Sequence, residues 1–425
     1  MRAPAAGAAR IAAGCAAARG ACILPPMPTV KLAELIDQPA AASFLRGVVA
    51  GGRFANAYLF HGAPGVGKGT AALAFARALL CERGAGRRAE PAGLFDAPLP
   101  AAGPADDACG ECPACLKAAS LQHPDLRFLF PVSGEERDLD ETVAETLAAW
   151  REDPLFVFAY EKFASIRLSL THDVLRELAF KPFEAVRRVV VVRDADRMRE
   201  DQYSALLKAI EEPGASTVWV LTTARLHRLP ATIRSRCQRV RFTPLAETTI
   251  TAFLERRAGT AAGEARLLVA LASGSLARAL MLREQRPLEL RNQALALLDP
   301  ALRGDPAALW KAVQGAARFG RAGRETLRGI IEVHELWLRD LLRARYGAAR
   351  AELVNRDREA EIRRQAASLD AREIRRRLMV LEEILRAIEG NVSPDLALFS
   401  GLARVAGQRL GEGEWPLHAA GRWDY

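Results

Sequence analysis

The chain has 425 residues, of which 50% are hydrophobic and 26% are charged, and its formal net charge is +9. Such a composition is typical of a globular protein with two or three domains. No stretch approaches the roughly 20 consecutive apolar residues of a membrane-spanning helix, and the positive charge is compatible with a nucleic-acid partner.

The N-terminal residues and the cysteines bear on the cellular compartment. Residues 1–27 are rich in Ala, Arg and Gly, and Arg10 and Arg19 interrupt the apolar run that a signal peptide needs. We expect a disordered leader, or a start assigned too early with the true start at Met27; a targeting segment is the alternative. The chain has seven cysteines, and this odd number without a secretory signal predicts a reducing compartment, the cytoplasm.

From residue 28 to residue 243, short apolar runs alternate with segments of helical periodicity. Five of these runs are predicted strands: Ala57–Phe60, Leu126–Val132, the four valines within Arg187–Met198, Thr217–Thr223 and Arg239–Phe242. This alternation predicts a doubly wound α/β domain. Residues 133–165 form an acidic, aromatic insertion to which the sequence assigns no function.

After residue 243 the apolar runs have helical spacing. Residues 244–286 predict a small helical lid, and residues 287–425 predict a larger helical domain.

The stretch HGAPGVGKGT, His61 to Thr70, resembles a phosphate-binding loop between a strand and a helix. The candidate nucleotide-binding residues in this loop are Gly62, Gly65, Gly67, Lys68 and Thr70. Glycines let backbone N–H groups converge on phosphates, and the lysine adds a positive charge; a plain glycine-rich turn is the alternative. Position 69 is glycine where a Mg²⁺-binding hydroxyl is expected, and Thr70 is turned away from that direction by about 100°.

A hydrolytic site also needs an acidic pair after a central strand. Here Arg193 stands where the metal-binding Asp belongs, and Asp194 stands where the catalytic Glu belongs. A guanidinium repels the cation that the site should hold. Because metal ligands are missing at positions 69 and 193, we expect no hydrolysis at this site.

The spacing C-x₂-C-x₂-C places three cysteines, Cys109, Cys112 and Cys115, within seven residues, with Cys81 upstream. Four thiolates form a closed tetrahedral site, so we predict structural zinc bound within residues 81–115. The alternatives are an iron–sulfur cluster and buried cysteines without a metal. His123 is a less favoured fourth ligand than Cys81.

Ser235, Arg236 and Cys237 follow a buried strand, and the simplest interpretation of this triplet is an ordinary basic turn. In ring-forming ATPases, however, an arginine at such a place reaches a neighbour's γ-phosphate and accelerates hydrolysis by on the order of a thousandfold or more.

Together these segments, which span about residues 53–280, resemble the AAA+ clamp-loader subunits of bacterial DNA polymerase III, and most closely the delta-prime type. The resemblance implies an α/β AAA+ domain with a zinc-binding insertion, a helical lid and a C-terminal all-helical collar. It also implies a ring with gamma/tau and delta subunits that places the sliding clamp on primed DNA, as part of the DNA-directed DNA polymerase III holoenzyme. Delta-prime subunits are commonly inactive as ATPases.

The resemblance also implies roles for individual residues. Arg236, with Ser235, would act as an arginine finger on ATP held by an adjacent gamma/tau subunit. The sensor threonine corresponds to Thr222 or Thr223, and Arg278 lies one place later than the second sensor of motor subunits.

Two other functions are compatible with the sequence. One is an ATP-hydrolysing gamma/tau-type motor, and the other is a free-standing, zinc-containing adaptor that binds nucleic acid. Nucleotide binding is also left open: Gly65, Gly67 and Lys68 would hold the phosphates of ATP or ADP, whereas Arg193 would fill the pocket.

Overall fold

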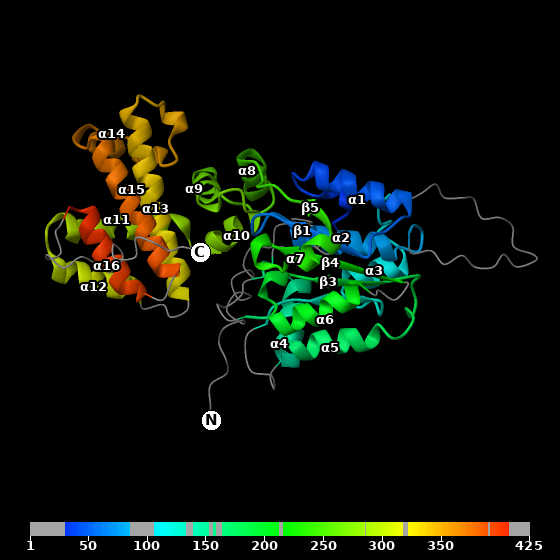
Figure 1. Cartoon of the computed structure of the whole chain (residues 1–425). Coiled ribbons are helices and arrows are strands. Elements are labelled where there is room, and N and C mark those ends of the chain that lie inside the picture. Colours follow the sequence, from blue (N-terminus) through cyan, green and yellow to red (C-terminus); the bar gives the residue numbers. More distant parts are fainter. Residues whose placement is uncertain are drawn as a thin grey trace, which may run out of the picture. The chain divides into compact units, whose positions relative to one another are not determined.

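A computed structural model describes residues 30–85, 106–132, 139–152, 156–158, 164–211, 216–284, 286–317, 322–389 and 392–407 (Figure 1). The chain forms two compact units. The first contains the described residues up to Ala252 together with Gly274–Leu280, and the second contains Phe253–Ser273 and the described residues from Met281 onward. The predicted leader lies outside the described residues.

The first unit contains a sheet of five parallel strands in the order β2-β3-β4-β1-β5. The strands are β1 Ala57–His61, β2 Leu126–Leu129, β3 Arg188–Val192, β4 Thr217–Thr223 and β5 Gln238–Arg241. The four consecutive valines of β3 are fully buried, as expected for a central parallel strand covered on both faces. The predicted α/β class and its five strands are therefore confirmed.

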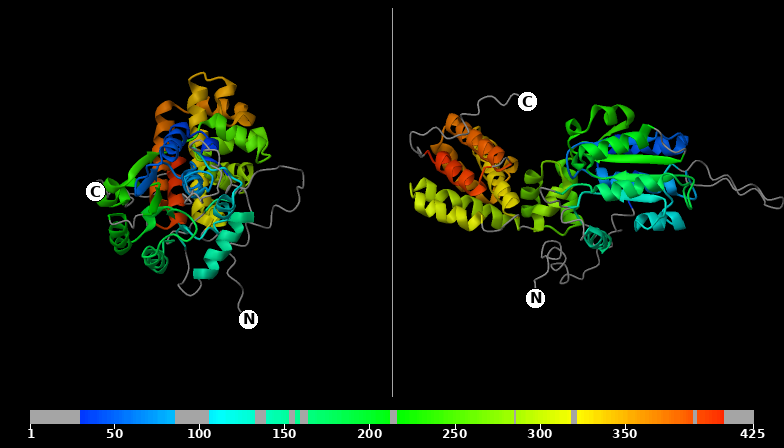
Figure 2. Two further views of the ribbon diagram at one scale, coloured as in Figure 1. Left: turned by 90° about the vertical axis from the view of Figure 1, so that its right-hand side faces the viewer. Right: turned by 60° about the horizontal axis from the view of Figure 1, so that its bottom comes forward.

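Helices cover both faces of this sheet (Figures 1 and 2). The helices of the unit are α1 Pro39–Gly51, α2 Lys68–Leu80, α3 Pro113–Ala119, α4 Leu139–Glu152, α5 Leu168–Glu177, α6 Glu200–Glu211 and α7 Ala231–Arg236. Alternate strand residues point to opposite faces. Val189 and Val191 therefore pack with α1, α2 and α3, whereas Val190 and Val192 pack with α5, α6 and α7.

The sheet brings the ends of three strands to one edge. All strands are parallel, β1 lies between β4 and β5, and β3 lies beside β4. The phosphate loop follows β1, Arg193 follows β3, and Thr222 and Thr223 end β4. The carboxyl edge of a parallel sheet is the usual place for a ligand site in such folds.

A buried aspartate fixes the segment that leads into β3. Asp125 is fully buried, and its carboxylate accepts backbone N–H groups from Phe183, Glu184 and Ala185 at 2.6, 2.8 and 2.8 Å. Asp125 itself lies directly before β2. One side chain thus fixes the entry to two adjacent strands.

We expect Asp125→Ala to lower the free energy of unfolding by at least about 2 kcal/mol, because three N–H groups lose a charged acceptor. Urea unfolding followed by circular dichroism measures this loss. The matched control is Asp173→Ala, since the Asp173 side chain is 62% exposed and should contribute about 0.5 kcal/mol or less. Equal stability of the two variants would contradict the role of Asp125.

Every element that the structure describes in the second unit is helical. Its helices are α9 Ala262–Ala272, α11 Pro287–Leu302, α12 Pro306–Ala317, α13 Ala322–Arg345, α14 Glu359–Ser368, α15 Ala371–Glu389 and α16 Pro394–Val405, with short 3-10 turns at Arg350–Glu352 and Arg356–Arg358. Helix α13 packs against α11, α14 and α15. Buried Asp340 accepts the N–H groups of Val354 and Asn355, which fixes the turn after α13.

Two helices, α8 Glu247–Arg256 and α10 Leu276–Glu284, run from one unit into the other. The predicted lid, residues 244–286, is therefore shared between the units: residues 244–252 and 274–280 belong to the first, and residues 253–273 and the described residues from 281 onward belong to the second. The three-domain division at 28–243, 244–286 and 287–425 stays a prediction. Within the described residues, no helix combines the length and apolar character needed to cross a membrane.

Candidate functional site

The phosphate loop joins β1 to α2 and depends on glycine at two closely packed positions. Gly62 and Gly65 have φ angles of 151° and 73°, which side chains rarely adopt. A Cβ at Gly62 would collide with the backbone carbonyl of Phe242, and a Cβ at Gly65 would collide with the side chain of Ser275. The loop is therefore held closely by the chain that follows β5 and by the start of α10.

Lys68, the first residue of α2, is 5% exposed and points back into its own loop. Its Nζ donates to the carbonyls of Gly62 and Ala63 at 2.9 and 2.5 Å. Burial lowers the pKa of Lys68 to about 8, and the charge of Asp194 acts in the opposite direction. The loop thus holds a buried lysine whose ammonium group is hydrogen-bonded to two carbonyls of the same loop.

Arg193 extends from the end of β3 to the space beside Gly69. A Cβ at position 69 would collide with Nη1 of Arg193. The guanidinium carbon lies 4.3 Å from the ring centroid of Phe158, and Nε lies 3.5 Å from Oδ2 of Asp194. The arginine therefore occupies the region into which a side chain at position 69 would extend. Thr70 is half-buried one position further along α2.

The two candidate sensor threonines have different partners. Oγ1 of Thr222 accepts the N–H of Asp194 at 3.0 Å, which joins β4 to the turn after β3. Oγ1 of Thr223 donates to Oδ1 of buried Asp196 at 2.8 Å, and Oδ2 of Asp196 accepts from Nε of Arg225 at 2.8 Å. Thr222 thus lies with Asp194 and Arg193, whereas Thr223 belongs to a separate buried network.

These residues do not fit a Mg²⁺ ion. Magnesium in a phosphate loop is held by a loop hydroxyl and by an Asp after the neighbouring strand. Position 69 has no side chain, position 193 carries a guanidinium, and Asp194 pairs with that guanidinium.

The four predicted cysteine ligands come together in a single cluster. The Sγ atoms of Cys81, Cys109, Cys112 and Cys115 all lie within 4.8 Å of one another. Cys81 directly follows α2 and Cys112 directly precedes α3, so two helix termini hold the cluster. The choice of Cys81 over His123 as the fourth member agrees with this geometry, because Sγ of Cys81, and neither ring nitrogen of His123, lies in the group with the other three sulfurs.

Thiolates are the form that binds metal ions, and Cys81 is the thiol of this cluster whose pKa is lowered, whereas burial raises the pKa of Cys112 and the hydrogen bond with Cys81 raises that of Cys115. A hydrogen bond from Cys115 and backbone N–H groups, including that of Cys109 at 3.4 Å, lower the pKa of Cys81 to about 5. The N–H groups of Cys112 and Cys115 point at further cluster sulfurs, each at 3.4 Å. Four convergent sulfurs with backbone donors around them could hold one metal ion tetrahedrally.

The Ser-Arg-Cys triplet lies at the end of α7, on the face of the sheet opposite α2. Arg236 is exposed, and its guanidinium forms an ion pair with Glu211 at 2.6 Å and donates to the carbonyl of Thr232 at 3.2 Å. Ser235 is also exposed and donates to the same carbonyl at 2.9 Å. The next residue, Cys237, is buried and anchors the turn.

Our sequence analysis missed two contributions to the phosphate loop. The first is Phe158, which belongs to the insertion at 133–165 and contacts Arg193; the aromatic residues of that insertion were the available signal. The second is the segment Gly274–Ala277, where Ala277 donates its N–H to the carbonyl of Gly65 at 3.3 Å. No short-range pattern predicts this second contact, because it joins residues far apart in the sequence.

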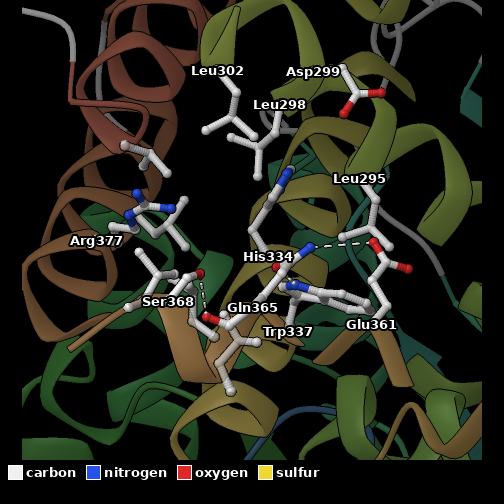
Figure 3. Close-up of a pocket in the computed structure, with 15 residues that line it drawn as sticks. Leu295, Leu298, Asp299, Leu302, His334, Trp337, Glu361, Gln365, Ser368 and Arg377 are labelled. Atoms are coloured by element: carbon white, nitrogen blue, oxygen red, sulfur yellow. Dashed lines mark hydrogen bonds between the residues drawn. The ribbon is translucent and has the colours of Figure 1, made fainter. Parts of the chain in front are cut away.

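The second unit contains a cavity of about 270 Å³, and seven of its fifteen lining residues are leucines (Figure 3). His334 and Trp337 of α13 and Gln365 of α14 lie around it, and Nε1 of Trp337 donates to Oε1 of Gln365 at 2.9 Å. Complete burial lowers the pKa of His334 to about 4, so its imidazole is neutral at physiological pH. None of the predicted site residues lines this cavity.

Comparison with known proteins identifies relatives of the chain. Residues 37–246 match the family described as DNA polymerase III, delta subunit. The DNA polymerase III subunit delta' of Escherichia coli (strain K12) is 27% identical over 375 residues, which cover 82% of this chain and 92% of that protein. The resemblance to delta-prime subunits is therefore confirmed.

Two further relatives match over shorter segments. The subunit delta' of Pseudomonas aeruginosa is 32% identical over 189 residues, which cover 44% of this chain and 43% of that protein. The DNA polymerase III subunit tau of Bacillus subtilis is 24% identical over 257 residues, which cover 59% of this chain and 37% of that protein. The matched segments thus span less than half the length of these two relatives.

Proposed function

Because this chain belongs to the bacterial DNA polymerase III clamp-loader subunit family, we propose that it is a delta-prime-like subunit that does not itself hydrolyse ATP. In this role it joins gamma/tau and delta subunits in a cytoplasmic complex that places the sliding clamp on primed DNA. The observation that carries the proposal is the position of Arg193, whose guanidinium lies beside Gly69.

The chemistry of phosphoryl transfer explains why this observation weighs against hydrolysis. A phosphate-loop ATPase needs a metal ion that bridges the β- and γ-phosphates, held by the loop hydroxyl and by a carboxylate after the next strand. Here both ligands are replaced: Gly69 has no side chain at the position of the hydroxyl, and Arg193 carries a positive charge at the position of the carboxylate. Lys68 is retained, but a lysine alone does not supply the missing metal.

Arg236 is the residue that we propose acts as an arginine finger on ATP held by a neighbouring gamma/tau subunit. It is exposed at the end of α7, while Ile233 and Cys237 on either side are buried and fix the turn. Arg236 forms an ion pair with Glu211, and the two side chains are 41% and 43% exposed. An ion pair this exposed contributes about 1 kcal/mol or less to stability. The guanidinium can therefore leave Glu211 for the stronger charge of a γ-phosphate.

Zinc is the metal that we assign to the cysteine cluster. Four sulfur ligands in a closed arrangement are typical of structural zinc, and they leave no open position for catalysis. The ion would join the end of α2 to the start of α3 and thereby stabilise the segment next to the phosphate-loop helix.

We expect purified protein to contain about one zinc ion per chain by plasma mass spectrometry, and Cys112→Ser to lose most of it, because one ligand is removed. Cys237→Ser is the matched control: it also changes a buried cysteine, but one outside the cluster, and it should retain zinc. A chain that contains iron, or neither metal, would contradict the zinc assignment.

The isolated chain should show no Mg²⁺-dependent ATP turnover above background, because its metal ligands are absent. Phosphate release should be the same for the unmodified chain and for Lys68→Ala, in which any residual phosphate-loop activity would be lost. Turnover that depends on Lys68 would instead favour a gamma/tau-type motor. The similarity to subunit tau is compatible with that alternative.

Arg236→Ala should leave the fold unchanged, because the side chain is exposed, and should lower ATP turnover by a loader assembled with gamma/tau and delta subunits. Turnover at the one neighbouring site should fall on the order of a thousandfold, which is typical for the loss of an arginine finger. Steady-state turnover and single-site occupancy measure this effect.

Arg239→Ala removes the same charge from a nearby exposed position and should leave turnover unchanged. Unaltered turnover with Arg236→Ala in an intact complex would remove Arg236 from this role. If the chain does not co-migrate with gamma/tau and delta subunits at all, an independent nucleic-acid-binding adaptor becomes the better assignment.

A further inference from the structure

Two basic side chains and the N-terminus of α2 meet at the phosphate loop, in a place where the residues do not fit a divalent cation. We propose that the guanidinium of Arg193 takes the place of Mg²⁺, so that this loop binds the polyphosphate of a nucleotide in its metal-free form. This inference concerns the isolated chain and is independent of the role of Arg236.

The space for the guanidinium exists because residue 69 is glycine. A Cβ there would collide with Nη1 of Arg193, so the guanidinium can keep this position only while residue 69 is glycine. The ring of Phe158 and the carboxylate of Asp194 lie next to the guanidinium and orient it. The two departures from a working ATPase site, at positions 69 and 193, are therefore one coupled change.

The charge of the site favours an anion over a cation. Lys68 and Arg193 contribute two positive charges. The carboxylates that act on Lys68 are Asp194, which also lies 3.5 Å from Arg193, and Asp196, which is already paired with Arg225. The first backbone N–H groups of α2 add the partial positive charge of a helix N-terminus. The two cations would attract a phosphate group, whereas they would repel a divalent cation.

A guanidinium is chemically suited to replace the metal ion. Its planar set of N–H donors binds two phosphate oxygens at once, and it keeps its charge at any physiological pH. Magnesium and Arg193 would compete for the same phosphate oxygens, so added Mg²⁺ should weaken binding by withdrawing the free nucleotide. This is the reverse of the dependence shown by a phosphate-loop ATPase.

Binding also requires a rearrangement within the loop. Nζ of Lys68 donates to the carbonyls of Gly62 and Ala63 and must exchange these acceptors for phosphate oxygens. Gly67, the residue directly before α2, has a φ angle of 95°, and no atom lies within 4 Å of the position that a Cβ would take there. The conformation in which Lys68 keeps its hydrogen bonds to these two carbonyls therefore competes with nucleotide binding.

Calorimetric titration of the full chain with ATP, in EDTA and then in excess Mg²⁺, tests the proposal. We expect saturable binding in EDTA and at least fivefold weaker binding in Mg²⁺. Arg193→Ala should weaken binding in EDTA at least tenfold. Arg199→Ala is the matched control, since it removes an exposed arginine six positions later. It should leave the affinity for ATP in EDTA unchanged.

A second pair of variants tests the coupling of positions 69 and 193. In Gly69→Ala the new methyl group should displace the guanidinium, which lies at the end of a flexible side chain, and weaken binding in EDTA without unfolding the chain. The double variant Gly69→Thr/Arg193→Asp restores both kinds of metal ligand, so Mg²⁺ should now strengthen binding.

Two results would overturn the proposal: no binding of ATP in either condition, or binding by the unmodified chain that requires Mg²⁺. The titration of the unmodified chain decides this even if the double variant does not fold. The titration contains no other subunit, so a chain that does not bind ATP could still be a clamp-loader subunit. Conversely, a chain that does not assemble with gamma/tau and delta subunits could still bind metal-free ATP.

Discussion

The parallel pairing of β1, β3 and β4 is the constraint on which the candidate site depends. In a parallel sheet all carboxyl ends lie at one edge, so the residues that follow separate strands are brought together there. The phosphate loop, Arg193 and Thr222 meet for this reason, although more than 150 residues separate Gly62 from Thr222 in the sequence. The packing of helices on both faces fixes this pairing, because a shift by one residue would exchange the side chains that pack against the helices of each face.

At this edge, steric and electrostatic effects act in the same direction. Gly69 makes room for a guanidinium, and the charge of the guanidinium disfavours a divalent cation. The loop nevertheless keeps its glycine backbone and its buried lysine. A site can therefore lose metal-dependent chemistry and still retain the features that attract phosphate. The same subunit offers an exposed arginine on the opposite face of the sheet, which is compatible with action on a ligand held elsewhere.

Helix α2 links this edge to the cysteine cluster. It begins with Lys68 in the phosphate loop and is followed directly by Cys81, whose thiol belongs to the cluster. Ten of the thirteen residues of α2 are buried, so the helix is a rigid connection within the core. A metal ion at the cysteines would fix one end of the helix that presents the phosphate loop at its other end.

The sequence by itself determined the strands, the loop and the cysteine group, because these depend on local patterns. Apolar runs identified the buried strands, Gly62 and Gly65 supplied conformations that other residues avoid, and the spacing of Cys109, Cys112 and Cys115 brought three thiols together. Only the tertiary structure decided that Arg193 lies beside Gly69 and contacts Phe158, that Thr222 rather than Thr223 joins Asp194, and that two units divide the expected lid. These features depend on distant parts of the chain, so they follow from sheet order and side-chain packing, and no local periodicity encodes any of them.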